Sequence, residues 1–494
     1  MAHPDWAVKF RRPGTELRRR TDKLYCLYEC SSVYDKQKKR ARKVTGRYLG
    51  SITEGGGFRP SKKRLLEQEL EQARRSGRDG VCAKVGAVKE YGFSRYILDC
   101  QSECVGVLKR LFPREWQRIV ALVYCRLRHQ SPLRYVQGDF ADSHLSVEIG
   151  ARGLSPNALS GFMRDLGKER PSMLAYMRSW IGGGEHLIFD GSDILSASRL
   201  MDFPRMSKTK IGTFDNVANM MWVFNSTRHM PVYYRLMPGN IKDVSSFRLC
   251  LEEAGLKDGV AVIDKGFQSK ENIELLDKAG VKFILSLRRS TAGLDHSVFA
   301  SRDNSGADGY FTYNDREIWW SRQDIDGREV FLYLDEVHRI EESRDYLRRV
   351  EDPKQEDHTM DGYRDKSLRF GTLALMSTSG KDARGAYIDY RTRTDVEQAI
   401  DVFKNCLEAD SSYMQDEKAL EAWMFINLIA MQWYYELRGR MVESKLIARF
   451  SPMQMVRVLG RARVVNVNGK WTPAELSKKE RKLFDTLGVH ITQN

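Results

Sequence analysis

Two observations predict an α/β fold with one mixed, five-stranded sheet. Between residues 183 and 289, short apolar segments occur in the order three strands, helix, strand, helix, strand. This alternation is typical of a layer of helices packed on a sheet. The chain is also 494 residues long, which is enough for a sizeable core and for more than one domain.

The elements of this sheet follow one another closely. Three glycines precede the apolar run "LIFD", which is expected to form a buried strand that ends at Asp190. The next two expected strands are "VANMMWVFNS" and "VYYRLMPGN". The helix "VSSFRLCLEEAG" ends at a glycine, a frequent helix terminator. The strand "GVAVID" then ends at Asp264, and the helix "SKENIELLDKAG" leads to the strand "VKFILSLRR".

The rest of the chain divides by composition and pattern. Residues 23–52 are predicted to form a β-hairpin, 61–80 a charged helix, and 90–182 several helices. These helices fit a DNA-binding module and plain packing equally well. The expected divisions begin with a basic N-terminal segment (1–85) and a helical region expected to bind DNA (86–182). The core follows in two parts (183–289 and 370–442), separated by a β-rich insertion (290–369), and a basic tail ends the chain (443–494).

The charge is strongly positive and uneven. The net charge is +15, the pI is about 9.3, and residues 1–50 hold fourteen Lys and Arg against five Asp and Glu. Such a balance favours an anionic partner, most simply nucleic acid, and a basic N-terminal segment can cover backbone phosphates without reading sequence. A merely soluble basic protein is the alternative.

Membrane, export and zinc signals are weak. No apolar run reaches transmembrane length, and the N-terminus becomes charged at once, so the sequence predicts a cytoplasmic protein. Cys26 and Cys30 lie in an expected strand, and Cys100 and Cys104 in an expected helix. Neither C-x3-C pair has further His or Cys at zinc-finger spacing, so reduced structural thiols are expected.

Asp190 and Asp264 stand at the expected carboxyl ends of two apolar strands. A carboxylate there is costly to bury alone, and two side by side raise each other's pKa unless a cation joins them. A divalent metal with hard oxygen ligands, such as magnesium, removes that repulsion. The alternative is that both residues begin turns, since "DG" and "DKG" are turn sequences.

The segment "DYRTRTDVEQAIDVFKNCLEAD", residues 389–410, is predicted to be an amphipathic helix. At 100° per residue, Arg393, Glu397 and Lys404 form one line along the edge of its apolar stripe. Glu397 is therefore expected at the margin of the core. Two alternatives give it a smaller role: a capping box with Thr394, and a surface pair with Arg393.

The spacing Tyr390-x2-Arg393-x3-Glu397-x6-Lys404 resembles the Y-(2)-R-(3)-E-(6)-K signature of the IS-four-type DDE transposases of bacterial insertion sequences. "LIFDGSD" and "VIDKGF" resemble the two Asp motifs of that family, and the likeness covers most of the chain. It implies a ribonuclease-H-like core interrupted by a mainly β insertion and preceded by a basic, mainly helical region.

The resemblance also implies roles for single residues. Asp190, Asp264 and Glu397 would be catalytic metal ligands, with Asp193 as the competing choice at the first motif; Asp190 is preferred because it ends the apolar run. Contacts with DNA would come from a second set: Tyr390, Arg393, Lys404, Lys265, Trp319 and Trp320. Because adjacent strand residues face opposite ways, one of the two tryptophans is expected in the core.

The implied activity is metal-dependent cleavage and transfer of DNA strands during cut-and-paste transposition, by two-metal phosphoryl transfer. The expected cofactor is two Mg²⁺ ions per site, replaceable by Mn²⁺. The expected partners are double-stranded DNA, as terminal inverted repeats and target, and a second copy of the chain in a synaptic homodimer, with no membrane and no small-molecule cofactor. The alternatives are a DNA-binding protein derived from a transposase and a metal-dependent nuclease of the same fold without strand transfer.

Overall fold

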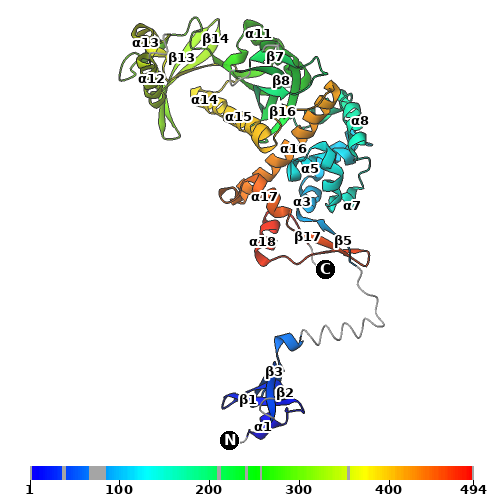
Figure 1. The fold of residues 1–494 in the computed structure, drawn as a ribbon. Helices are drawn as coiled ribbons and strands as arrows, with labels where there is room; N and C mark the ends of the chain where they lie inside the picture. The colour runs from blue at the N-terminus through cyan, green and yellow to red at the C-terminus, as the bar shows by residue number, and fades with distance from the viewer. Residues whose placement is uncertain are drawn as a thin grey trace. The chain divides into compact units, whose positions relative to one another are not determined.

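The computed structural model describes residues 3–35, 40–65, 85–208, 213–239, 243–255, 259–352 and 357–491. The chain forms two compact units, Met1–Gly86 and Ala87–Asn494 (Figure 1). Each unit has its own hydrophobic core. Of the helix predicted over 61–80, residues 66–80 lie outside the described residues.

The N-terminal unit is a four-stranded antiparallel sheet in the order β1-β2-β3-β4, with the short helix α1 (Asp5–Val8). The strands are β1 Thr15–Thr21, β2 Leu24–Asp35, β3 Arg40–Thr53 and β4 Gly57–Pro60. The pairing of β2 with β3 confirms the hairpin predicted over 23–52. Its core is small: among the described residues of this unit, the buried cluster consists of Ala7, Leu17, Tyr25, Leu27 and Ile52.

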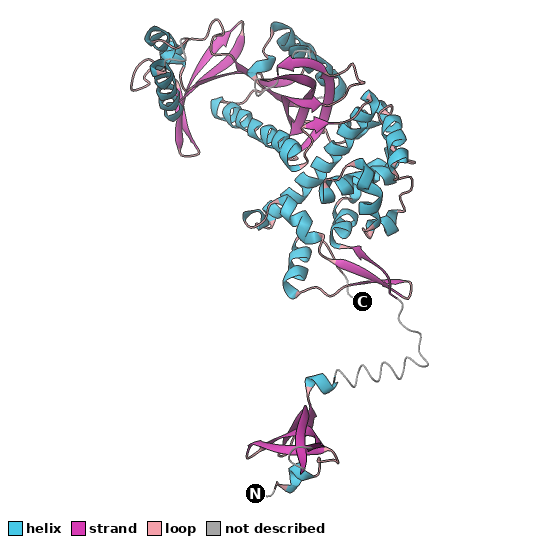
Figure 2. Ribbon diagram, viewed as in Figure 1, coloured by secondary structure: helices cyan, strands magenta, loops and turns pink. Residues whose placement is uncertain are grey.

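The five predicted strands form the centre of the main sheet. They are β6 His186–Ser196, β8 Phe214–Asn225, β9 Met230–Pro238, β10 Val260–Ile263 and β11 Lys282–Leu287. Their spatial order is β9-β8-β6-β10-β11, with β8 antiparallel to both neighbours and β6, β10 and β11 mutually parallel. The helices α10 (Asp243–Ala254) and α11 (Lys270–Lys278) make the crossovers. This mixed sheet with its helices is the predicted ribonuclease-H-like α/β fold (Figure 2).

Further strands extend the sheet to eleven. After β11, the chain forms β12 Gly309–Tyr313, β13 Arg316–Ile325 and β14 Arg328–Asp335, then the helices α12 Glu336–Glu351 and α13 Met360–Lys366, and then β15 Thr372–Ser377. β15 pairs with β11 on one side and with β14 on the other, so these strands continue the core sheet. Two short strands, β7 Arg205–Lys208 and β16 Ser411–Ser412, pair with β8 and β6.

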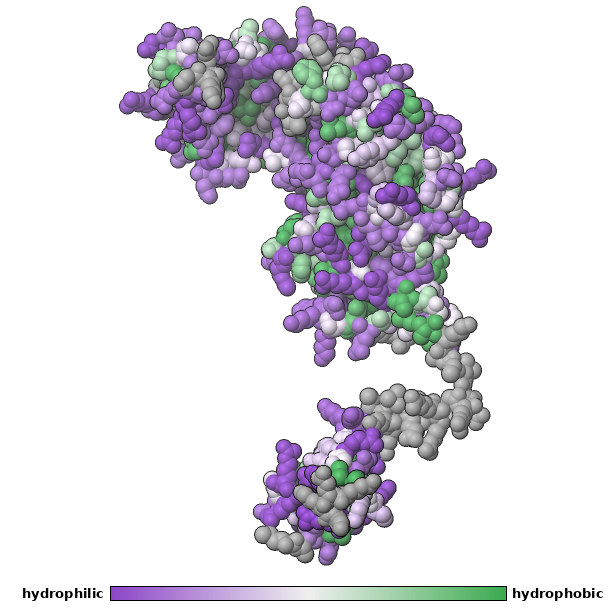
Figure 3. All heavy atoms as spheres, in the orientation of Figure 1, coloured by the Kyte–Doolittle hydropathy of each residue, from purple (hydrophilic) through white to green (hydrophobic). Residues whose placement is uncertain are grey.

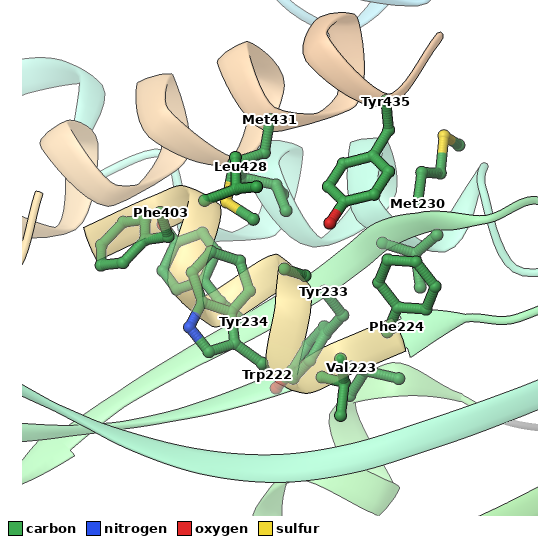
Figure 4. Close-up of a cluster of buried hydrophobic side chains, with 14 of the residues drawn as sticks. Trp222, Val223, Phe224, Met230, Tyr233, Tyr234, Phe403, Leu428, Met431 and Tyr435 are labelled. Atoms are coloured by element: carbon green, nitrogen blue, oxygen red, sulfur yellow. The ribbon is translucent and has the colours of Figure 1, made fainter. Parts of the chain in front are cut away.

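The long helix α16 (Glu417–Glu443) is buried along most of its length, as its all-round apolar pattern predicts. One stretch of it covers the sheet: Figure 4 shows Leu428 and Met431 over Trp222, Tyr234 and Phe403. The ring of Trp222 contacts that of Phe403 edge to face, with centroids 5.1 Å apart. The core helix therefore joins the sheet to the rest of the larger unit.

The helical region before the sheet packs around α16. Its helices are α3 Gly92–Cys100, α4 Ser102–Leu111, α5 Trp116–His129, α6 Val136–Ala141, α7 Leu145–Ile149, α8 Pro156–Leu166 and α9 Arg170–Arg178. Tyr96 donates to the Trp433 carbonyl, and Tyr176 donates to Gln432. These buried contacts give the region a packing role in the core.

The C-terminal elements complete the unit: α17 Pro452–Leu459, the three-stranded sheet of β5 (Val85–Glu90), β17 (Arg463–Val467) and β18 (Lys470–Pro473), and α18 Lys478–Thr486. None of the helices in the described ranges combines the length and apolar character that a membrane crossing requires.

The cysteines behave as structural thiols. Cys26 and Cys30 lie in β2 as predicted, but Cys100 ends α3 and Cys104 lies in α4, so the expected single helix is wrong there. Each of the seven cysteines in the described residues is free. Burial raises the pKa of the Cys104 thiol to about 11, which keeps it protonated.

Candidate active site at two neighbouring parallel strands

Asp190 and Asp264 occupy matching positions on neighbouring strands. Phe189 of β6 is paired with Ile263 of β10, and each aspartate is the next residue along the chain. Asp264 directly follows β10, as expected. The expectation that Asp190 ends its strand is wrong, because β6 continues to Ser196 through its pairing with β8. The two carboxylates still emerge at the same level of the sheet.

The predicted helix over 389–410 is divided into three pieces. Tyr390 lies in α14 (Ala383–Arg391), Arg393 and Glu397 lie in α15 (Arg393–Asp401), and residues 402–406 form a π-helical turn. Val396 and Ala399 are buried and hold α15 against β6 and β8. The capping-box alternative is not supported, because the residue before α15 is Thr392 and it makes no side-chain capping bond.

The guanidinium of Arg393 joins all three candidate carboxylates. Its Nη2 lies 3.3 Å from Oδ2 of Asp264 and 3.7 Å from Oδ1 of Asp190, and its Nη1 lies 3.1 Å from Oε1 of Glu397. Burial alone would lower the pKa of Arg393, but the charges of Asp264 and Asp190 raise it above its ordinary value. The surface pair of Glu397 with Arg393 is therefore only one of the three contacts that this guanidinium makes with carboxylates.

The donor set at this point fits a hard divalent cation. Three carboxylates from β6, the end of β10 and α15 converge on one positive group, and carboxylate oxygens are the ligands that magnesium prefers. Asp190 and Asp264 are largely buried, with side chains 12% and 22% exposed, whereas Glu397 is 52% exposed. No three acidic, His or Cys side chains in the described ranges are close enough to one another to hold a metal. At this point, the guanidinium of Arg393 contacts all three carboxylates.

Tyr390 contacts one of these three carboxylates. Its hydroxyl donates to Oδ1 of Asp264 at 3.4 Å, and burial raises the pKa of this hydroxyl above its ordinary value. The buried phenol therefore remains protonated and can act as a donor. The side chain contributes to the core and to the site at once.

Lys404 lies in the π-helical turn, where the 100° per residue of the helical wheel does not apply. A π-helical turn takes more residues than an α-turn, so the phase changes after Asp401. The Nζ of Lys404 lies 2.8 Å from Oδ1 of Asp193, which was the competing choice for the first metal ligand. Asp401, the acid three residues before Lys404, accepts a hydrogen bond from Asn405.

Arg126 of α5 and Gln130, which directly follows α5, hold the end of this turn, and neither was predicted from the sequence. Arg126 donates to the Leu407 carbonyl and, at 3.1 Å, to Asn427 of α16, and Gln130 donates to the Cys406 carbonyl. Burial lowers the pKa of Arg126 to about 10. An arginine in the apolar run "IVALVYCRL" was the available signal, because such a cation needs a buried partner.

A cavity of about 870 Å³ opens beside the carboxylates. Its lining includes Asp264, Lys265, Tyr390 and Arg393 from the core. Other lining residues come from the insertion, namely His338, Glu342, Lys366 and Arg369, and Phe370 follows it directly. Lys265 thus lies at the cavity, as a DNA contact requires. Cations outnumber acids in this lining, which suits a polyanion.

The two candidate tryptophans lie in β13 and outside this lining. Trp319 packs on Tyr310 with ring centroids 5.1 Å apart, and Trp320 packs edge to face on Phe331 at 6.2 Å. Both are half-buried against the core, rather than one buried and one exposed. The structure therefore does not bring them to the carboxylates.

The sequence matches the family model described as "Transposase DDE domain" over residues 181–433. A comparison with curated proteins gives no match. Among solved structures, the chain is similar to a piggyBac transposase synaptic complex with hairpin DNA, at 11% identity, 75% coverage of this chain, 79% of the other and a TM-score of 0.39. It is also similar to a Mos1 transposase paired-end complex with the left transposon end, at 10% identity, 73% and 90% coverage and a TM-score of 0.16.

The family match extends from just before β6 to the middle of α16, so it includes both aspartates, the insertion and Glu397. It covers more than half of the 494 residues, and the chain belongs to the transposase DDE domain family.

Proposed function

We propose that this protein is an IS-four-type transposase that binds the ends of an insertion sequence and catalyses DNA strand cleavage and strand transfer in cut-and-paste transposition. The observation that carries the proposal is the convergence of Asp190, Asp264 and Glu397 on one guanidinium, in a chain of the transposase DDE domain family. These three carboxylates are the proposed ligands of two Mg²⁺ ions, for which Mn²⁺ can substitute.

When bound, the metal ions supply an activated oxygen nucleophile and stabilise the leaving oxygen at phosphorus. The chain's own residues prepare the site. Tyr390 fixes one oxygen of Asp264, and the buried strands β6 and β10 hold both aspartates at one level. Arg393 has a planar, bidentate donor set, which suits a scissile phosphate beside the carboxylates.

The proposed substrate is double-stranded DNA, as terminal inverted repeats and as target. Lys265, Lys366 and Arg369 line the 870 Å³ cavity beside the carboxylates, and this basic lining supports the binding of a phosphodiester chain there. A second copy of the chain would complete a synaptic homodimer, one for each transposon end.

The test is an incubation of the purified protein with Mg²⁺ and a labelled duplex carrying the sequence that flanks its gene. A product joined to a second DNA supports the transposase. A nicked product without joining indicates a nuclease, and binding without cleavage indicates a DNA-binding protein derived from a transposase. Mg²⁺ omission and an Asp190→Asn sample control for contaminating nucleases.

A further inference from the structure

Part of the N-terminal sheet is only two strands wide. Residues 31–35 of β2 pair with residues 40–44 of β3. β1 pairs with β2 no farther than Glu29, and β4 pairs with β3 only from Gly50 onward. We call residues 31–35 and 40–44 the β-ribbon.

The β-ribbon is exposed on both faces. Every side chain described in it, from 31 to 34 and from 40 to 44, is exposed, including Val33 at 56% and Tyr34 at 62%. A two-stranded hairpin is marginally stable by itself in water. An extension that buries nothing within its own unit is therefore suited to contact with another molecule.

The charge of the protein is concentrated in this unit. Residues 1–65 hold eighteen Lys and Arg against six Asp and Glu, which gives a net charge of +12 out of the +15 of the whole chain. The described surface that Figure 3 shows for this unit is mostly hydrophilic. This charge is complementary to a polyanion.

Two arginines present that charge on one face of the β-ribbon. Arg40 and Arg42 are two residues apart in β3, so their side chains leave the same face. Neither forms a hydrogen bond or ion pair with another residue in the described part of the chain, whereas Lys43, on the opposite face, is paired with Glu16. The two guanidinium groups are thus available to a ligand.

We propose that the β-ribbon is a docking element for duplex DNA. The β-ribbon enters the major groove, and Arg40 and Arg42 bind the phosphates along the wall of that groove. The major groove of B-DNA is wide enough for a two-stranded β-ribbon, and cations on such a ribbon gain affinity by releasing counterions. The choice of DNA as partner rests on the proposed function. The β-ribbon and the carboxylates belong to different units of the chain.

The experiment measures binding of the full-length protein to a fluorescein-labelled mixed-sequence DNA duplex by anisotropy across a salt series without Mg²⁺. We expect Arg40→Ala/Arg42→Ala to weaken binding at least tenfold near 100 mM salt and to reduce the salt slope by about two units. The matched control is Arg11→Ala/Arg12→Ala, which removes two exposed arginines of the same unit outside the β-ribbon. Circular dichroism checks that both variants are folded.

The outcomes separate the two proposals. Unchanged affinity and slope in the Arg40/Arg42 variant, or an equal loss in the control variant, overturns the β-ribbon proposal. Tighter binding to a matched RNA duplex also overturns it, because the deep, narrow major groove of A-form RNA does not admit the ribbon. If wild type and the β-ribbon variant bind DNA equally and both cleave it, only this inference fails. If wild type binds DNA but never cleaves it, only the proposed strand chemistry fails.

Discussion

The Nη2 atom of Arg393 lies 3.3 Å from Oδ2 of Asp264, so a cation on α15 meets the carboxylate that follows β10. The same nitrogen also reaches Asp190. One arginine thus compensates the charge of two neighbouring aspartates that would otherwise repel each other in a largely buried place. The pairing explains how the carboxylates can gather before any substrate arrives.

Replacing a single candidate ligand should abolish cleavage. We expect Asp190→Asn, Asp264→Asn and Glu397→Gln each to lower the cleavage rate by at least about 100-fold, since even outer partners of a metal ligand contribute tenfold to 100-fold. DNA affinity should stay equal or rise, because a negative charge is lost while the basic surface remains. Asp401→Asn, an exposed acid on the same helix, serves as the control. Full activity of Asp190→Asn together with an inactive Asp193→Asn would assign the first ligand to Asp193.

Removing the guanidinium should make the fold dependent on metal. Arg393→Gln leaves three acids without their shared partner, and we expect a loss of about 1–3 kcal/mol in unfolding free energy at neutral pH. Added Mg²⁺ should raise the melting temperature of the variant more than that of wild type. The control is Arg391→Gln, an exposed arginine two residues earlier. Equal Mg²⁺ effects in wild type and both variants would show that Arg393 and the metal do not share a site.

The Lys404–Asp193 pair can be separated from DNA binding by a double-mutant cycle. If Lys404 also contacts a phosphate, Lys404→Ala should reduce the salt slope of DNA binding by about one unit, and adding Asp193→Asn should not restore it. Stability should behave differently. Lys404→Ala leaves Asp193 without this partner, so we expect a lower melting temperature that Asp193→Asn partly restores. An unchanged salt slope would leave Lys404 with a structural role alone.

Glu16 should make the N-terminal unit sensitive to acid. A hydrogen bond from Lys43, with others from Thr45 and Arg18, lowers the pKa of Glu16 from 4.5 to about 2. The folded state therefore binds fewer protons than the unfolded state in this range, so the stabilisation is present above pH 4.5 and is lost as the pH falls toward 2. Carboxyl-carbon NMR of glutamate-labelled protein, assigned with Glu16→Gln, should give a midpoint near 2. A midpoint near 4.5 would contradict the contacts.

The central sheet could be predicted because each of its strands is a continuous apolar run between turn residues. β6, β10 and β11 are buried on both faces, and this gives the strong local signal of parallel strands. The eleven-stranded extent of the sheet could not be predicted. It depends on the pairing of β15 with β11 across the whole insertion, and such long-range pairing leaves no periodicity in the sequence.

The site was predictable in composition and less so in geometry. Arg393 contacts Asp190, Asp264 and Glu397, because neighbouring strands and an α-helical face fix the positions of these residues. Lys404 does not follow the helical wheel, since the wheel assumes 100° per residue and the chain forms a π-helical turn there. That turn is held by Arg126 from a distant helix, which is a tertiary contact that local sequence does not encode.

The unbroken pairing of β11, β15 and β14 has a mechanical consequence. An insertion joined to its host by two loops can swing as a hinged flap, but this one shares a hydrogen-bonded ladder with the core. Its helix α12 follows β14 directly. Arg289, which lies just after β11, donates from Nη1 to both carboxylate oxygens of Glu342 on that helix, at 3.0 and 2.9 Å. The parts of the cavity lining that come from the core and from the insertion are therefore held at a fixed distance from each other. That distance limits the width of the molecule that can lie against the carboxylates.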